Sequence, residues 1–147
     1  MSLKFSTGLR AGMLATNPLR TLLAGGEIRL YSGPAPASVD SALGGSNLLL
    51  CTIKTDAGAG LTFEATAPGG TITKSLAEVW QGEVVAAGTA TFYRHVLASD
   101  TGAASTTAVR IQGNIGIAGA DMNLSNIALV VGAIQKLEAY SITLPEF

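Results

Sequence analysis

Hydrophobic and polar residues follow two different periods along this chain, and the change occurs at Gly26. Before that glycine, Leu9, Met13 and Leu14 recur at intervals that place them on one face of an α-helix. From Glu27 onward, apolar and polar residues mostly alternate, which is typical of β-strands. The pattern therefore predicts a short helical segment followed by a β domain.

The helical segment contains its own start and stop signals. Ser6 or Thr7 can cap its first turn. Asn17-Pro18 interrupts it, and Asn at the cap with Pro at the first helical position favours the start of a second helix. Gly25-Gly26 ends that helix. We expect a kinked or broken helix from about Thr7 to Ala24.

The predicted apolar face of this N-terminal helical arm, residues 1–26, has two interpretations. It either covers the core of the chain's own β domain, residues 27–147, or docks on a neighbouring subunit. Leu19 belongs to the face in both cases. Under the second interpretation the candidate subunit-interface residues are Leu9, Met13, Leu22 and Leu23.

The alternating region divides into short strands separated by turn residues such as Asp56-Ala57-Gly58 and Ala67-Pro68-Gly69-Gly70. No helical pattern of the kind that joins parallel strands lies between them. The sequence therefore predicts an all-β fold, an antiparallel β-sandwich of jelly-roll or Greek-key type with a short N-terminal helical segment. The expected strands are Glu27–Tyr31, Leu48–Lys54, Gly60–Glu64, Thr71–Lys74, Val79–Val85, Thr89–Leu97, Thr106–Gly113, Ile127–Val131 and Leu137–Leu144.

Two aromatic residues are expected in the core. Along Thr89–Leu97, alternation places Phe92 and Arg94 on one side of the strand and Tyr93 and His95 on the other, and Phe92 is expected to face the core. Trp80 is the only tryptophan, and we expect it to anchor the core with its N–H donating to a carbonyl.

Composition narrows the function classes. The chain has 147 residues, of which 48% are hydrophobic and 13% charged, with 18 glycines and a net charge of −1. Its longest apolar stretch, Ile127–Ile134, is far shorter than the roughly 20 residues of a membrane-spanning helix. No basic run favours nucleic acid or a membrane surface, and Met1–Arg10 shows no secretion signal. We therefore expect neither partner, and the low charge indicates surfaces that meet other protein subunits.

The residues that carry chemistry are few. His95 is the only histidine, and we expect it to be hydrogen-bonded or solvent-facing, because no second ligand suggests zinc and no Gly-x-Ser-x-Gly motif suggests a catalytic triad. Cys51 is expected to be a buried small hydrophobe. The scattered carboxylates define no particular pair, so we expect no catalytic residues, no metal site and no cofactor. They are Glu64, Glu78, Glu83, Asp100 and Asp121.

Three further features favour structural roles. Gly113–Gly119 lacks the spacing and the lysine of phosphate-binding loops, so its glycines are expected to allow turns or close backbone approach. Asp121–Asn126 is expected to form Asx turns rather than a calcium loop. Arg29, Arg94 and Arg110 lie in separate predicted strands, where each is expected to pair with a carboxylate.

Nearly the whole chain resembles small jelly-roll virion proteins of tailed bacteriophages, of the capsid cement or decoration type. The resemblance lies in fold-pattern features and not in catalytic signatures. The segments that carry it are Gly26–Gly33, Trp80–Gly82, Gly88–Arg94, Arg110–Gly113, Gly119–Asn126 and Ser141–Pro145.

The resemblance implies a non-enzymatic protein, made in the host cytoplasm and located on the capsid surface of the virion. It implies a homo-oligomer whose partners are the major capsid protein, or another virion protein, and copies of itself. Two alternatives stay open: a tail, baseplate or head-to-tail connector protein, and a carbohydrate- or receptor-binding module in which Trp80, Tyr93 or Tyr31 stacks on a sugar.

Overall fold

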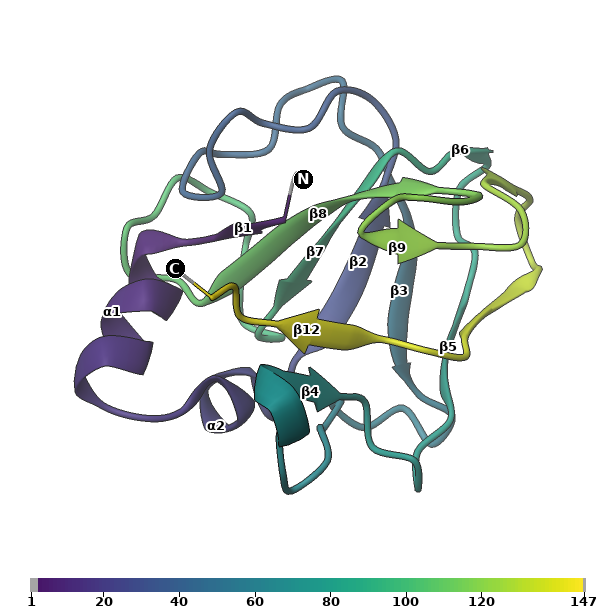
Figure 1. Ribbon diagram of the computed structural model, residues 1–147. Coiled ribbons are helices and arrows are strands. Elements are labelled where there is room, and N and C mark those ends of the chain that lie inside the picture. The colour runs from purple at the N-terminus through teal and green to yellow at the C-terminus, as the bar shows by residue number, and fades with distance from the viewer. Residues whose placement is uncertain (1–2, 147) are drawn as a thin grey trace.

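The computed structural model describes residues 3–146, and residues 1, 2 and 147 at the ends of the two predicted segments lie outside that range. The arm forms a short strand β1 (Lys4–Phe5) and two helices, α1 (Thr7–Ala15) and α2 (Leu19–Leu23). The break between the helices is where the sequence predicts it. Figure 1 shows both helices at one end of a largely β structure.

The predicted ends of the helices agree with the structure except at the start of α2. The Ser6 hydroxyl accepts a hydrogen bond from the Leu9 N–H at 3.1 Å and caps α1. Pro18, with an extended ψ of 155°, occupies the N-cap of α2, so the expected Asn17 cap is wrong and no side chain caps this short helix. Gly25 follows α2 with a φ of 79°, which suits a residue without a Cβ.

The remaining elements are strands and one short 3₁₀ turn, η1 (Pro68–Gly70). Most strands are shorter than their apolar patterns suggest. They are β2 (Glu27–Tyr31), β3 (Leu49–Thr55), β4 (Thr71–Thr73), β5 (Trp80–Glu83), β6 (Gly88–Thr89), β7 (Phe92–Val96), β8 (Arg110–Gly116), β9 (Met122–Asn123), β10 (Ala128–Leu129), β11 (Ile134–Leu137) and β12 (Ser141–Thr143).

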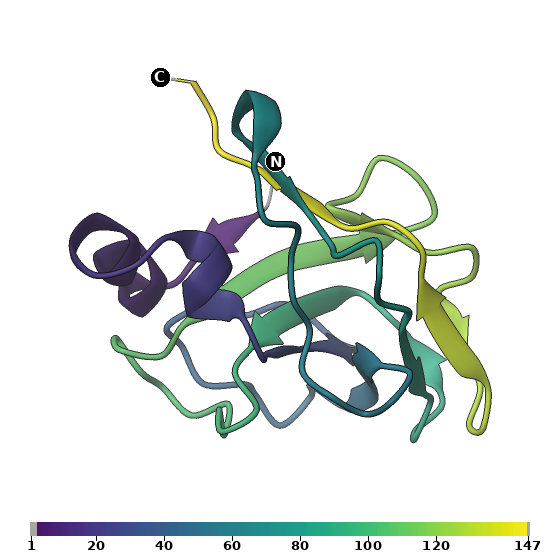
Figure 2. The same ribbon diagram turned by 90° about the horizontal axis from the view of Figure 1, so that it is seen from below.

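The main sheet has eight strands in the order β1-β8-β7-β2-β3-β5-β11, with β9 beside β8. Its pairs are antiparallel except β8–β9. The β10–β6 and β12–β4 pairs form two small antiparallel ribbons. Figure 2 shows the β12–β4 ribbon lying over one face of the main sheet, so the all-β, sandwich-like prediction is confirmed, whereas jelly-roll topology is not.

Several predicted strands have different limits in the structure. Gly60–Glu64 forms only isolated bridges through Leu61 and Phe63. The segment predicted as Thr106–Gly113 begins later, as β8, and continues through the glycine-rich stretch to Gly116. The segment Leu137–Leu144 is divided between β11 and β12, because the chain leaves the main sheet there to form the ribbon.

The main core lies between the central strands and the β12–β4 ribbon. Ile28 and Leu30 of β2, Tyr93 of β7 and Ile111 of β8 belong to one buried cluster with Ile142 of the ribbon. In the cross-strand register, Ile28 pairs with His95 and Leu30 with Tyr93, so the two β7 residues face the main core.

Phe92 therefore faces away from the main core, and the predicted orientation of β7 is wrong. It is nonetheless fully buried and stacks on Tyr31 at 5.2 Å between ring centroids. Loop 32–48 covers this second face, because Arg94, which lies on the same side of β7 as Phe92, donates to the Ser41 carbonyl of the loop at 3.0 Å. Both faces of β7 are thus removed from water.

Candidate functional site

Polar side chains on the loop-covered face form a row across three neighbouring strands. Arg29 of β2 pairs with Arg94 of β7, which pairs with Gln112 of β8. Arg94 Nε donates to Gln112 Oε1 at 3.0 Å, and one Arg94 terminal N–H group donates to the Ser41 carbonyl at 3.0 Å. Gln112 donates to the Pro36 carbonyl at 2.8 Å. The row therefore ties loop 32–48 to the sheet.

The predicted pairing of each arginine with a carboxylate holds for two of the three. Arg29 forms an ion pair with Glu27 at 2.7 Å, and Arg110 forms one with Asp100. Arg94 instead bonds an amide and a carbonyl, and its Nη1 is buried without a hydrogen-bond partner. Burial and the nearby Arg110 charge lower the pKa of Arg94.

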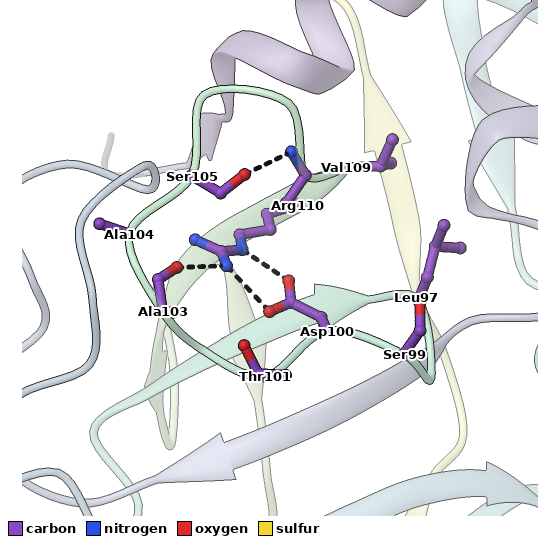
Figure 3. A pocket seen from close by; sticks show the side chains of 10 residues that line it. Leu97, Ser99, Asp100, Thr101, Ala103, Ala104, Ser105, Val109 and Arg110 are labelled. Atoms are coloured by element: carbon purple, nitrogen blue, oxygen red, sulfur yellow. Dashed lines mark hydrogen bonds and ion pairs between the residues drawn. The ribbon is translucent and has the colours of Figure 1, made fainter.

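A surface hollow of about 260 Å³ surrounds the Arg110–Asp100 pair (Figure 3). Arg110 Nε lies 2.5 Å from Asp100 Oδ2, and Nη2 donates to Oδ1 at 2.9 Å and to the Ala103 carbonyl at 2.7 Å. Its Nη1 donates to the Val39 carbonyl at 3.2 Å. Arg110 thus joins loop 97–109 to loop 32–48.

The electrostatics of Asp100 fit this structural role. Burial raises the pKa of its carboxyl, but the hydrogen bond from Arg110, the bond from the Gly102 N–H and the charge of Arg110 together lower it. The carboxylate is therefore held ionised as a clamp. It is committed to Arg110 and Gly102, so it is not a free acid or base for chemistry in the hollow.

His95 lies within an aromatic cluster in the main core. Its ring stacks on Phe63 at 5.6 Å and lies 5.7 Å from the Tyr140 ring and 6.5 Å from the Trp80 ring. Neither ring nitrogen has a hydrogen-bond partner among the described residues. The prediction of a hydrogen-bonded or solvent-facing histidine is wrong, and burial lowers the pKa of His95 to about 3.

Trp80 is buried as predicted, although its hydrogen-bond acceptor differs. Its Nε1 donates to Glu78 Oε1 at 3.0 Å, a carboxylate oxygen and not a backbone carbonyl. The same oxygen accepts the Thr62 N–H at 2.9 Å. Trp80 and Tyr93 are each 1% exposed, and Tyr31 is 5% exposed, so none of these rings presents a face on which a sugar could stack.

Cys51 and the remaining loop features fill structural positions. Cys51 is fully buried, and burial raises the pKa of its thiol to about 11. Asn114 N–H donates to Asp121 Oδ2 at 3.0 Å, and Asp121 N–H donates to Asn114 Oδ1 at 2.8 Å. Asn126 Oδ1 accepts the Ala128 N–H at 2.9 Å, which is the predicted Asx turn. Residues 3–146 contain no group of three or more His, Cys, Asp or Glu placed to hold a metal ion.

The structure separates the candidate interface residues of the arm into two pairs. Leu9 and Leu23 are fully buried and belong to the main core cluster, so they cover the chain's own core. Met13 and Leu22 are partly buried against that cluster. Met13 also lines an apolar groove of about 460 Å³ between the helices and the β12–β4 ribbon, with Ile142 and Leu144 on the other side.

An exposed apolar patch, which the sequence did not predict, lies at the end of the main sheet away from the helices (Figure 2). It consists of Val85, Val130, Val131 and Ile134, which are 64%, 66%, 58% and 55% exposed. Backbone hydrogen bonds hold these segments together, because the Val84 N–H donates to the Ala133 carbonyl and the Gly132 N–H to the Val84 carbonyl. The apolar run Ile127–Ile134 was the signal that could have revealed it.

The patch borders β11, the last strand of the main sheet on that side. Figure 2 places this yellow-green strand at the edge of the molecule away from the helices. A sheet edge beside exposed apolar side chains is a surface suited to protein contact. The apolar patch and the β11 edge together are the candidate functional site.

Comparisons of the chain with protein-family models, curated proteins and solved structures found no match. None of the described helices is long and apolar enough to cross a membrane.

Proposed function

We propose that this chain is a non-enzymatic structural protein of a tailed bacteriophage particle, specifically a capsid cement or decoration protein. It would stabilise the head by binding the major capsid protein and copies of itself. The phage assignment rests on the sequence resemblance, and the observation that carries the role is the exposed apolar patch of Val85, Val130, Val131 and Ile134.

The patch supports a protein partner because it places branched aliphatic side chains in water. Removing apolar surface from water contributes about 25 cal/mol per Å² before the costs of association. A partner that covers all these side chains gains this term, provided that Glu83, which is exposed and lies opposite Ile134 in the register, stays in water or meets a basic group. Repetition over a capsid then lets weak contacts act together.

The loop-covered face supports the same role. Long loops that cover a sheet are ordinarily the mobile part of a domain. Here the side chains of Arg94, Arg110 and Gln112 bond their backbone carbonyls, which favours a single shape. A subunit that must match a fixed capsid lattice benefits from such rigidity.

The test is quantitative mass spectrometry of purified particles from cells that produce the phage. A cement protein is expected in heads in a fixed ratio to the major capsid protein, at many copies per particle. Absence of the chain from the particles overturns the proposal, and confinement to the tail fraction replaces it with a tail, baseplate or connector role.

A matched pair of variants tests whether the patch makes the contact. Val131→Asp places a charge in the patch and is expected to reduce incorporation at least about tenfold, because the carboxylate must be desolvated on binding. Leu14→Asp changes another exposed aliphatic residue, 89% exposed on α1, and is expected to leave incorporation unchanged. Equal incorporation of both variants contradicts a role for the patch.

A further inference from the structure

The edge strand β11 pairs with β5 on one side only, so the N–H and C=O groups of every second residue point away from the sheet. The Val84 N–H donates to the Ala133 carbonyl, and in an antiparallel ladder the groups of successive residues point alternately to the two sides. Gln135 and Leu137, which lie opposite Gly82 and Trp80, therefore face β5. Lys136 and Glu138 direct their backbone groups away from the sheet.

The Gln135 side chain gives independent support for this direction. Its amide donates to the Lys136 carbonyl at 2.8 Å, in an exposed hydrogen bond between adjacent residues. The Lys136 carbonyl thus accepts a hydrogen bond from a side chain of its own strand and not from a neighbouring strand. Another strand can replace that group without breaking a hydrogen bond of the sheet.

The opposite edge of the sheet is less available. Beyond β8 it is covered by two short strands, with β1 paired to Gln112 and Ile111 and β9 paired to Ile115 and Gly116. Each of these covering strands has two residues, whereas β11 has four and continues into exposed Glu138. The β11 edge is therefore the better template for strand addition.

The charged residues at this edge determine which charges an added strand must carry. Lys136 and Glu138 are both exposed, are two residues apart and so project on the same side of the strand. Neither forms an ion pair within residues 3–146. An added antiparallel strand pairs with both only if an acidic residue lies opposite Lys136 and a basic residue, two positions earlier in the added strand, lies opposite Glu138.

A second copy of β11 meets that requirement. With Leu137 opposite Leu137 of the second copy, Lys136 lies opposite Glu138 on both sides of a twofold axis. Lys136 and Glu138 are also the residues whose backbone groups point away from β5. In this register the same two residues therefore form both the hydrogen bonds between the strands and the charge pairs. Opposite charges across strands stabilise pairing, and like charges oppose it.

We infer that this chain forms a twofold dimer by antiparallel pairing of β11 with β11 of a second copy, in the register that places Lys136 opposite Glu138. The apolar patch lies beside this junction through Ile134. The inference deepens the proposed function by naming one self-contact of a capsid subunit, and it rests on that function for its biological purpose. The pairing itself is a property of the free protein.

Charge reversal provides the test, measured by sedimentation equilibrium of the purified chain over a range of concentrations. Lys136→Glu places Glu opposite Glu, and Glu138→Lys places Lys opposite Lys. Each is expected to raise the dimer dissociation constant about tenfold or more, because each repulsion occurs on both sides of the axis. The double variant Lys136→Glu/Glu138→Lys restores opposite charges and is expected to restore the dimer.

Arg10→Glu is the matched control, since it changes the net charge by the same amount as Lys136→Glu at an exposed position of α1, which follows β1 at the other edge of the sheet. It is expected to leave the dimer intact. Circular dichroism establishes that each variant is folded. A wild-type protein that stays monomeric at high micromolar concentration overturns the inference, as does a double variant no better than the single ones. These measurements contain no capsid, so their failure is distinct from failure to find the chain in particles.

Discussion

The imidazole of His95 stacks on the ring of Phe63 with 5.6 Å between centroids and 29° between planes, while both of its nitrogens lack hydrogen-bond partners in the described part of the chain. A polar ring in this position behaves as a core aromatic only while it is neutral. Protonation would place an unpaired charge in the main core, which is why burial lowers its pKa to about 3.

The first prediction is a loss of stability in mild acid. In the unfolded chain His95 takes up a proton near its ordinary pKa of about 6.5, whereas the folded chain resists until about pH 3. The unfolded state therefore binds more protons in this window, and the free energy of unfolding falls as the pH decreases.

His95→Leu is expected to flatten this dependence between about pH 7.5 and 5, above the range where carboxylates titrate. Urea unfolding at both ends of the window measures it. Asp100 contributes separately at lower pH, because its lowered pKa means that its stabilisation is lost as the pH falls. An unchanged slope in the leucine variant would show that His95 is solvated or hydrogen-bonded.

The second prediction concerns the Arg110–Asp100 clamp. The two side chains are 2% and 5% exposed, so Asp100→Asn leaves a buried arginine without its counter-charge. We expect a loss of about 3 to 5 kcal/mol in the free energy of unfolding. Asp56→Asn, at an exposed turn, is the control and is expected to change it by less than about 0.5 kcal/mol. If both variants change the free energy of unfolding equally, the Arg110–Asp100 pair does not stabilise the fold.

The third prediction compares two glycines. A Cβ at Gly82 would overlap the Thr52 carbonyl of the adjacent strand and also approach Cys51 Sγ at 3.0 Å. Gly82→Ala is therefore expected to lower the free energy of unfolding by about 1 to 3 kcal/mol. Gly45→Ala meets no atom within 4 Å and is expected to be neutral. Denaturant unfolding measures both, and a neutral Gly82→Ala would show that β3 and β5 can move apart.

The fourth prediction distinguishes the two interpretations of the helical arm. Leu9 is fully buried, so Leu9→Ala leaves a cavity in the chain's own core and is expected to cost about 2 to 5 kcal/mol. Leu14→Ala, at an 89% exposed position in the same helix, is expected to change stability by no more than about 0.5 kcal/mol. Urea unfolding of both variants at the same protein concentration separates these cases. A neutral Leu9→Ala would mean that the arm is not part of the core.

The sequence predicts correctly those helix boundaries that are set by residues adjacent in the chain. Asn17-Pro18 breaks the helix because proline cannot donate the helical hydrogen bond, and Gly25 ends the arm through a positive φ that other residues adopt with difficulty. The edge at β11 and the short strands β1 and β9 were not predictable in this way. Each is defined by a partner far away in sequence, such as Gln112 for Lys4.

The sequence by itself determined that the chain is mostly β with a broken helical arm, because the two periods and their glycine and proline boundaries are local properties of the backbone. Only the tertiary structure decided which side of β7 faces the main core, and it placed His95 there and Phe92 beneath loop 32–48. Alternation identifies the buried side of a strand when the other side meets water. All residues of β7 are buried, so alternation along this strand does not show which side faces the main core. The segments that cover the two sides are distant in the sequence.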